Sequence, residues 1–317
     1  MTENDVSSEL ANPFTLKNDD GFFWAKGNLH SHTTNSDGKP SPQERVDGYG
    51  AQGYDFLCLS DHYRITRTDT VSAPDGLLLI QGAELHPDNP FGGQRHHFLC
   101  LNLREDIDSV NMPPQHVIDE VRRQGGCVWL AHPFWSSINV IRDVLPLRGF
   151  AGVEVFNTTC RCQGRGESST HWNDWMEQED RLYPALANDD SHALERDQKD
   201  TYQGWTMARV KERSAQSIVD ALVKGATYST TGPQIHDISL RRVDRPEGDQ
   251  QLVEATISCS EAQRILAVSD TFGKEFRIPG ETFEKATFTI HPISRWVRFE
   301  IHAPDGSKAW SNPFDLR

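Results

Sequence analysis

Histidine and acidic residues follow most of the short apolar runs in the first two thirds of this 317-residue sequence. His30 and His32 come directly after the first run, and because alternate residues of an extended segment share a face, both imidazoles can bind one ion. His96 and His97 precede the run that begins at Phe98. The other groups stand at or shortly after the end of a run: Asp37, Asp61 with His62, Glu84 with His86, His132, and Asp190 with His192. Imidazole and carboxylate ligands without thiolate favour Mn²⁺, Fe²⁺ or Zn²⁺, so the pattern predicts a metal site.

Seven apolar runs are expected to position these side chains as buried strands. They span residues 24–29, 55–60, 77–83, 98–101, 127–131, 152–156 and 184–187. The runs are apolar enough to be buried on both faces and alternate with helix-like or loop-like stretches, which indicates parallel strands in an α/β fold. Seven such strands approach a closed barrel, and an α/β barrel collects its functional groups at the carboxyl ends of its strands.

Three segments between these runs are predicted to be helices. Ser41 can cap the first one, because Pro42 occupies the first helical position and Glu44 completes a capping box. The other two span residues 114–124 and 214–224, and each ends near a glycine, which is a common helix stop.

The rhythm of the sequence changes after Pro233, where short alternating strands and turn signals begin. The expected strands span residues 235–243, 251–258, 264–269, 286–291 and 296–301. This pattern is typical of a small all-β, sandwich-like domain. We therefore expect an N-terminal extension over residues 1–21, a barrel over residues 22–232 and the sandwich-like domain over residues 233–317.

The composition disfavours several classes of partner. Lysine and arginine number 32 against 46 aspartate and glutamate residues, which gives a formal net charge of −14. This charge disfavours binding to duplex nucleic acid or to an anionic membrane, so the expected partner is a small molecule, with the oligomeric state left open. The first ten residues are polar, and three of the six cysteines lie inside apolar runs, so we expect a cytoplasmic protein with reduced thiols.

The ordered series of histidines and carboxylates resembles the polymerase and histidinol phosphatase (PHP) superfamily of metallohydrolases. The resemblance covers most of residues 24–232. It is carried by the stretch His30 to Gly38, the pair Asp61 and His62, Glu84 after Gly82 and Ala83, the step His132 to Pro133, and Asp190 with His192. It implies a distorted seven-stranded (β/α) barrel, in agreement with the seven runs, and metal-dependent hydrolysis by a metal-bridging hydroxide.

The same resemblance implies three adjacent positions for two or three divalent ions (Mn, Fe or Zn). The first would use His30, His32, Glu84 and Asp190. The second would use Glu84, His97 and His132, so Glu84 would bridge two ions. The third would use Asp37, His62 and His192. We choose His97 over His96 because it directly precedes the strand, as in the family. Many members have histidine in place of Asp37, which leaves occupancy of the third position open.

The C-terminal part resembles a subset of this superfamily, the carbaryl-hydrolase-like (CehA/McbA) type. The residues that carry this second resemblance are Tyr228 to Pro233, Arg298 in the last long run, and Ala309 to Pro313. The resemblance implies hydrolysis of a neutral ester, carbamate or amide, and it names no single substrate.

Two further roles need side chains close to the metal positions. His192 or His86 could donate a proton to the leaving group. A phosphate could be bound through the paired N–H groups of Arg64, or of Arg161 and Arg165 in the loop expected over residues 157–171.

Other residues next to the motifs have less direct roles. We expect Asp61 and Asp189 to orient imidazoles rather than bind a metal. Four aromatic side chains could line an apolar substrate pocket, namely Tyr63, Phe134, Trp135 and Trp172.

Three functions are compatible with these features. The first is a phosphoesterase acting on a small nucleotide or sugar phosphate, favoured by the superfamily and by the arginines. The second is a hydrolase of a neutral ester, carbamate or amide, favoured by the C-terminal resemblance and the aromatic residues. The third is a non-catalytic module that only binds metal, or a partner through its β-domain, which the intact series of ligand-type residues argues against.

Overall fold

Two units divide the computed structural model of this chain. The larger unit runs from Phe23 to Ser229, and the smaller one combines Thr230–Arg317 with the N-terminal residues up to Phe22. The structure describes residues 9–16, 20–193, 200–244 and 251–317. Within these residues, no helix is long and apolar enough to cross a membrane.

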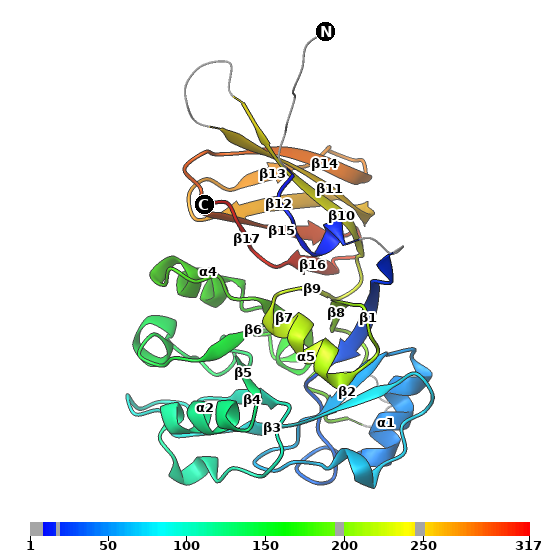
Figure 1. Ribbon diagram of the computed structural model, residues 1–317, viewed down its shortest axis with the longest axis vertical. Helices are drawn as coiled ribbons and strands as arrows, with labels where there is room; N and C mark the ends of the chain where they lie inside the picture. Colours follow the sequence, from blue (N-terminus) through cyan, green and yellow to red (C-terminus); the bar gives the residue numbers. More distant parts are fainter. Residues whose placement is uncertain (1–8, 17–19, 194–199, 245–250) are drawn as a thin grey trace. The chain divides into compact units, whose positions relative to one another are not determined.

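The larger unit is a mixed α/β structure whose sheet is rich in parallel pairs (Figure 1). Its strands are β1 (Phe23–Asn28), β2 (Phe56–Leu59), β3 (Leu78–Leu85), β4 (Phe98–Leu101), β5 (Cys127–Leu130), β6 (Phe150–Asn157), β7 (Ala185–Asn188), β8 (Trp205–Val210) and β9 (Thr227–Thr230). Hydrogen-bonded neighbours follow the order β9-β8-β1-β2-β3-β4-β5-β6-β7. The pairs β1–β2, β2–β3, β5–β6 and β6–β7 are parallel, as the apolar runs predicted.

Strand β4 runs against its neighbours, so the expectation of parallel pairing is wrong for this strand. It is antiparallel to both β3 and β5, with Phe98 opposite Leu85 and Leu130. The connection between β3 and β4 spans only residues 86–97 and holds no helix, so the chain turns back beside β3 instead of crossing over. This reversal brings the start of β4, and with it His97, to the edge where the other predicted strands end.

The segments that follow β1 and β7 meet at this same edge. The amide of Asp190 donates to the carbonyl of His30 at 2.8 Å. The amide of His32 donates to the carbonyl of Ser191 at 2.9 Å. The first and last of the seven predicted strands are therefore joined where the histidines and carboxylates are concentrated.

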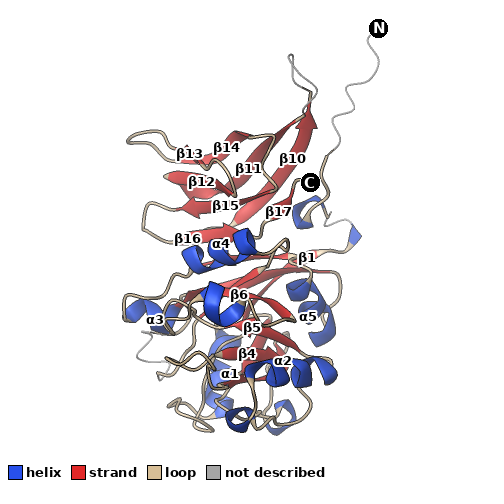
Figure 2. Ribbon diagram, turned by 90° about the vertical axis from the view of Figure 1, so that its left-hand side faces the viewer, coloured by secondary structure: helices blue, strands red, loops and turns tan. Residues whose placement is uncertain are grey.

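The helices of the larger unit lie outside the strands (Figure 2). They are α1 (Pro42–Ala51), α2 (Pro114–Arg123), α3 (Thr158–Cys162), α4 (Ser169–Gln178) and α5 (Ala215–Val223). The capping box predicted for α1 is confirmed, because Ser41 and Glu44 each accept a hydrogen bond from the other's backbone amide. Helices α3 and α4 replace most of the loop expected over residues 157–171. Val46 and Tyr49 of α1 pack against Leu57 of β2, which fixes this helix against the sheet.

Cysteine side chains form part of the apolar core between the strands. Cys58, Cys100 and Cys127 are buried, as the runs around them predicted. Burial raises the pKa of the Cys127 thiol to about 11, so it stays protonated and behaves as an apolar group.

The C-terminal part of the smaller unit consists of antiparallel strands. They are β10 (Ile235–Val243), β11 (Leu252–Ala262), β12 (Arg264–Ser269), β13 (Lys274–Phe276), β14 (Phe283–Ile290), β15 (Trp296–His302), β16 (Lys308–Ser311) and β17 (Phe314–Asp315). One sheet has the order β10-β11-β14, and β13-β12-β15-β16 follow one another in a second, with β17 also paired to β15. The rings of Phe288 in β14 and Phe299 in β15 lie 6.0 Å apart and pack the two sheets together. Asn12 joins this unit by donating to the carbonyl of Ile238 at 3.0 Å.

Acid is expected to weaken the smaller unit through Glu300, a buried residue of β15. Its Oε1 lies 2.6 Å from Arg298 Nη1, and its Oε2 lies 3.6 Å from His302 Nε2. Burial alone would raise the pKa of Glu300, but His302 and Arg298 lower it to about 2 from its ordinary 4.5. Since the folded-state pKa is depressed, this stabilisation is complete above pH 4.5 and is lost as the pH falls toward 2.

Urea unfolding at pH 6 and pH 3 measures this effect. Between these pH values, wild type should lose about 2 kcal/mol more unfolding free energy than Glu300→Gln, which has no carboxylate to protonate. Equal losses in the two proteins would contradict the assignment.

Candidate metal centre

The histidines and carboxylates singled out in the sequence meet at the edge where the parallel strands end. Glu84 is the second-last residue of β3, and the others flank strands: His30 and His32 after β1, His62 after β2, His86 after β3, His97 before β4, His132 after β5, and Asp190 and His192 after β7. Asp37 lies between β1 and α1. Groups whose ligand atoms all lie within 4.8 Å of one another include His30 with His32, Glu84 and Asp190; Glu84 with His97 and His132; and His32 with Asp37, His62 and His192.

Glu84 lies at the centre of this cluster, and its two carboxylate oxygens face different histidines. Oε1 is 2.8 Å from His97 Nδ1 and 3.2 Å from His132 Nε2. Oε2 is 3.2 Å from His30 Nε2 and 3.0 Å from His62 Nδ1. Burial alone would raise the pKa of Glu84, but the positive charge of His30 and its neighbours holds it well below its usual range. A carboxylate in this position can bridge two cations.

The group of His30, His32, Glu84 and Asp190 is here called the deepest group, because all four residues are buried. The surroundings of its ligand atoms suit a metal ion. His32 Nε2 and His30 Nε2 lie 2.9 Å and 3.2 Å from Asp190 Oδ1. All three atoms are buried, yet none has a hydrogen-bond partner of acceptable geometry within the described structure. Because a buried polar atom without a partner costs free energy, these atoms suit a cation placed between them.

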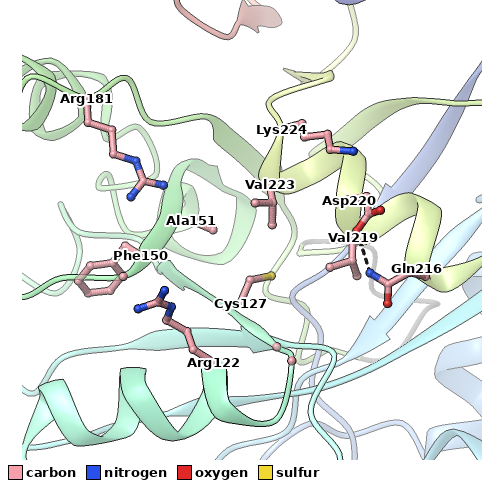
Figure 3. Close-up of a pocket in the computed structure, with 13 residues that line it drawn as sticks. Arg122, Cys127, Phe150, Ala151, Arg181, Gln216, Val219, Asp220, Val223 and Lys224 are labelled. Carbon is pink, nitrogen blue, oxygen red and sulfur yellow. Dashed lines mark hydrogen bonds between the residues drawn. The ribbon is translucent and has the colours of Figure 1, made fainter.

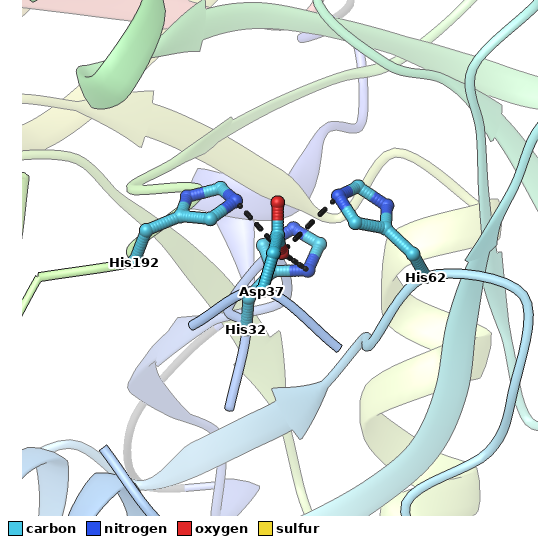
Figure 4. Close-up of side chains that lie close together, drawn as sticks. All are labelled: His32, Asp37, His62 and His192. Carbon is cyan, nitrogen blue, oxygen red and sulfur yellow. Dashed lines mark ion pairs between the residues drawn. The ribbon is translucent and has the colours of Figure 1, made fainter. Parts of the chain in front are cut away.

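The group of His32, Asp37, His62 and His192 lies around the Asp37 carboxylate (Figure 4). Oδ1 of Asp37 lies 3.4 Å from His62 Nε2, 3.3 Å from His192 Nε2 and 3.9 Å from His32 Nδ1. The Asp37 side chain is 57% exposed, so this group is open to solvent. Burial alone would lower the pKa of His192, but Asp37 and Asp190 raise it to about 9. The carboxylate and the imidazoles converge as ligands of a third cation would.

The two adjacent histidines before β4 have different surroundings. His97 faces Glu84, and its ring stacks on His86 with the centroids 3.8 Å apart. His86 also reaches Glu84, since its Nε2 lies 3.4 Å from Oε1. The ring of His96 lies 5.3 Å from Phe98, and burial lowers the pKa of His96 to about 4. His96 is therefore placed as a neutral, buried side chain.

Two cluster residues have a left-handed backbone. His132 has φ 26° and Asp190 has φ 54°. A residue with a Cβ adopts such a conformation at a cost of about 1–3 kcal/mol, and the surrounding structure must offset it. Here the strained backbone lies in the two residues that carry ligand-type side chains at the ends of β5 and β7.

Glu154 of β6 orients the deepest histidine, and the sequence analysis missed it. Its Oε1 lies 3.0 Å from His30 Nδ1 and accepts from Asn188 Nδ2 at 2.9 Å. Its Oε2 accepts from the amide of His132 at 3.0 Å and from Asn157 Nδ2 at 2.9 Å. With a cation in place of the Nε2 proton, Nδ1 of His30 would donate to Glu154 and the Nε2 lone pair would face the cation. The sequence does contain one indication of this role, because Glu154 is the single carboxylate in a buried and mostly apolar strand.

Arg45 of α1 ties together the two chain segments that carry the deepest group. The side chain is fully buried, and its Nε and Nη2 each donate to the carbonyl of His32 at 3.2 Å. Nη2 also donates to the carbonyl of Ser191 at 3.1 Å. No motif identifies this residue, because its partners here are main-chain carbonyls that any sequence would offer.

The expectation that Asp61 and Asp189 orient imidazoles is wrong. Asp61 accepts from the Thr33 hydroxyl at 2.8 Å and the Ser36 hydroxyl at 2.6 Å, so it shapes the loop that carries Asp37. Asp189 accepts from the Tyr49 hydroxyl at 2.7 Å. Each residue precedes a cluster member by one position, but its carboxylate accepts from hydroxyl groups rather than from an imidazole.

The three arginines predicted to bind phosphate make no direct contact with the cluster. In the described residues, Arg64, Arg161 and Arg165 form no hydrogen bond or ion pair with a cluster member, and all three are exposed. Arg161 lies in α3, and Arg165 donates to the Ser137 hydroxyl at 3.1 Å. Their role in phosphate binding stays a prediction.

A different cation lies beside the cluster. Arg95 pairs with Asp88 at 2.8 Å, and its Nη1 approaches the Tyr63 hydroxyl at 3.5 Å. The Tyr63 ring lies 4.8 Å from the ring of His86. Arg95 follows a glycine-rich turn rather than a strand end, so the pattern of polar residues at strand ends does not identify it.

The candidate pocket aromatics divide into two kinds. Trp135 is a neighbour of the cluster, with its ring 5.2 Å from that of His132, and Tyr63 contacts His86. Phe134 is exposed, and its ring lies 5.8 Å from that of His171 in a tilted arrangement. Trp172 is fully buried and donates to the carbonyl of Tyr183, so it packs inside the unit and lines no substrate site.

Replacing Gly38 by alanine is expected to disturb the deepest group. A Cβ at this position would lie 2.4 Å from the carbonyl carbon of His32 and 2.6 Å from the amide of Thr33. Since both are main-chain atoms, the backbone that carries His32 must move, and we expect a loss of about 2 kcal/mol in unfolding free energy with reduced bound metal. Gly273→Ala is the control, because its Cβ would meet nothing closer than 3.4 Å. Equal metal content in the two variants would show that Gly38 is not needed for this geometry.

Comparison with known proteins gives a fold rather than an activity. No protein-family model matches the chain. An uncharacterized protein of Methanocaldococcus jannaschii is 26% identical over 143 residues, which cover 43% of this chain. The match spans 54% of that relative, about half of its length.

Solved structures are similar over longer stretches. A two-domain protein of Bacteroides vulgatus, which contains a predicted PHP-like metal-dependent phosphoesterase, matches with a TM-score of 0.50 and 20% identity. The match covers 94% of this chain and 96% of that one. An amidohydrolase of Chromobacterium violaceum, solved with bound sulfate and no metal, covers 53% of this chain and 87% of its own at a TM-score of 0.40 and 15% identity. This chain thus shares the fold of the Bacteroides protein, and its function must be argued from its own side chains.

Proposed function

We propose that this chain is a metal-dependent hydrolase of the PHP type that acts on small phosphate esters. The observation that carries the proposal is Glu84, a buried carboxylate whose two oxygens face separate histidines within a cluster of three overlapping ligand-type groups. The proposal includes a distorted seven-stranded barrel for the larger unit and a sandwich-like domain from residue 233 onward. The hydrogen bonds between the ends of β1 and β7 support the barrel.

The residues that would hold the ions follow from the groups described above. They are His30, His32, Glu84 and Asp190 for one position; Glu84, His97 and His132 for the next; and Asp37, His62 and His192 for a third. Imidazole and carboxylate donors suit Mn²⁺, Fe²⁺ or Zn²⁺. Such ions lower the pKa of coordinated water and neutralise charge that develops on substrate oxygens.

In this proposal the side chains of the protein position the metal ligands and donate a proton to the leaving group. Glu154 and Arg45 fix the ring and the backbone of the deepest histidines, so the donor atoms need no rearrangement when a substrate binds. His86 and His192 are our candidates for the proton donor to the leaving group, because each has an imidazole next to the cluster.

An anionic substrate would find cations at the edge of the cluster. Arg95 is held by Asp88 beside Tyr63, and its planar donors match a phosphate group. Arg64, Arg161 and Arg165 stay in the proposal only as exposed side chains that a larger substrate could reach. The cysteines inside apolar strands support our further proposal of a cytoplasmic location.

A second candidate function is hydrolysis of a neutral ester, carbamate or amide, as in the carbaryl-hydrolase-like type. The contact of Trp135 with His132 and of Tyr63 with His86 favours it. Aromatic rings beside a metal site offer an apolar surface on which the leaving group of a neutral ester or carbamate can pack.

One assay separates the two functions. The Mn²⁺-loaded protein is offered 1-naphthyl phosphate and 1-naphthyl N-methylcarbamate, and release of 1-naphthol is measured for each. Because both substrates share one leaving group, only the bond attacked differs, and we expect faster release from the phosphate. Arg95→Gln should slow the phosphate reaction by about tenfold and leave the carbamate rate unchanged, since only the phosphate carries the charge. Faster release from the carbamate would replace the phosphoesterase with the second candidate, and no release from either would remove both.

A further inference from the structure

A pocket of about 320 Å³ opens at the amino ends of β5 and β6, the opposite ends from those that lead to the metal centre (Figure 3). Cys127 is the first residue of β5, and Phe150 is the first residue of β6. The other side chains that line it come from α2, α5 and the segment before β7. The pocket therefore has no residue in common with the metal centre.

Three cationic side chains line this pocket: Arg122, Arg181 and Lys224. Within the described residues, no carboxylate lies within ion-pair distance of any of the three. The neighbouring arginines are different, because Arg123 pairs with Glu120 at 2.7 Å and Arg148 approaches Glu179 at 3.4 Å. In a chain with a net charge of −14, three such unpaired cations around one pocket favour an anionic ligand.

The side chains of Arg122 and Arg181 are exposed, and each has a neighbour on one side. Figure 3 shows Arg122, Arg181 and Phe150 on the same side of the pocket. Arg122 lies over Gly149, where an added Cβ would be 2.9 Å from its Cδ and 3.0 Å from its Nη1. Arg181 lies over the ring of Tyr183, 4.9 Å from the centroid.

The remaining lining is mostly apolar. Phe150, Ala151, Val219 and Val223 contribute carbon surface. The carboxylate of the lining residue Asp220 accepts from Gln216 Nε2 at 2.8 Å, so part of its hydrogen-bonding capacity is already used. A ligand for this pocket needs a charged group for the arginines and an apolar body for the floor.

We propose that this pocket is a binding site for a small organic phosphate, separate from the metal centre. Paired guanidinium groups match the tetrahedral oxygens of a phosphate through parallel N–H donors. A volume of about 320 Å³ lies at the lower end of the range for small-molecule sites, which suits a single ring with one phosphate group. The strands β5 and β6 connect this site to His132 and Glu154 of the metal centre.

Phenylphosphonate is the probe, because its carbon–phosphorus bond resists hydrolysis. Its affinity for the full-length protein is measured by isothermal titration calorimetry. The double variant Arg122→Gln/Arg181→Gln should bind at least about tenfold more weakly, since it loses the charge-assisted hydrogen bonds. Arg123→Gln is the matched control on the same helix, and it should change the affinity by less than roughly twofold.

A second comparison separates this site from the metal centre. A phosphoesterase metal centre would also bind phenylphosphonate, so the arginine substitutions are compared in the Glu84→Gln background, where this centre is disabled. One binding event should remain in Glu84→Gln, and adding Arg122→Gln/Arg181→Gln should weaken it at least about tenfold. Absence of binding to Glu84→Gln, or unchanged affinity after the arginine substitutions in this background, would each overturn the proposal. A failure of the phosphoesterase assay would leave this test unaffected, because it measures binding at another place.

Discussion

Replacing Glu84 by glutamine is expected to abolish hydrolysis and to release bound metal. Both carboxylate oxygens of Glu84 lie within 3.2 Å of histidine nitrogens on two sides, so this one side chain belongs to more than one of the ligand groups. Glutamine has nearly the same volume but carries no charge, and its amide would place an N–H₂ group where an acceptor is needed. The expected loss of activity is at least about a thousandfold, which corresponds to about 4 kcal/mol of transition-state stabilisation.

Metal content and naphthol release are measured on the same samples, with Mn²⁺ supplied in excess. Glu120→Gln is the control, because Glu120 lies on α2 and its carboxylate contacts Arg123 and Gln124, which are outside the cluster. A cooperative urea transition in Glu84→Gln would show that the chain still folds. Full activity of Glu84→Gln after metal removal would refute a metal-dependent reaction.

The sequence predicted the strands and helix starts of the larger unit well where apolar runs were long and capping or turn residues marked their ends. The capping box at Ser41 and Glu44 determined the start of α1 correctly, because that signal is local. The direction of β4 was not predictable from its composition, since a run that is buried on both faces reads alike in either orientation. What decides its direction is the short connection over residues 86–97.

The residues that orient the cluster were harder to find than the residues that form it. Histidines at strand ends can be recognised in the sequence by their residue type and position. The structure brings all nine predicted ligand residues together. Arg45 bonds to main-chain carbonyls of segments that come close only after folding, so nothing in the sequence marks it. Asp61 and Asp189 show the converse error, because each carboxylate is next to a ligand in sequence but accepts from hydroxyl groups instead of an imidazole.

Glu154 offers the sharpest test of how the cluster is oriented. Each of its four hydrogen-bond partners contributes an N–H group: His30, Asn188, Asn157 and the amide of His132. A carboxylate is the one side chain that accepts all four, because it has two oxygens and no hydrogen. In Glu154→Gln one of these oxygens becomes the NH₂ group of an amide, which faces another donor and leaves a buried group without a partner.

We therefore expect Glu154→Gln to weaken Mn²⁺ binding by about 10–100-fold, the usual consequence of removing a partner of a metal-binding histidine. Calorimetric titration with Mn²⁺ measures the affinity, and nitrogen NMR of the imidazoles reports whether His30 still carries its proton on Nδ1. Glu300→Gln is the matched control, because it removes a buried carboxylate from the smaller unit and should leave Mn²⁺ affinity unchanged. If Glu154→Gln lowered only the unfolding free energy and bound Mn²⁺ as wild type does, Glu154 would be a packing residue. A shift of the His30 proton together with the loss of affinity would establish that Glu154 selects the tautomer that the metal centre needs.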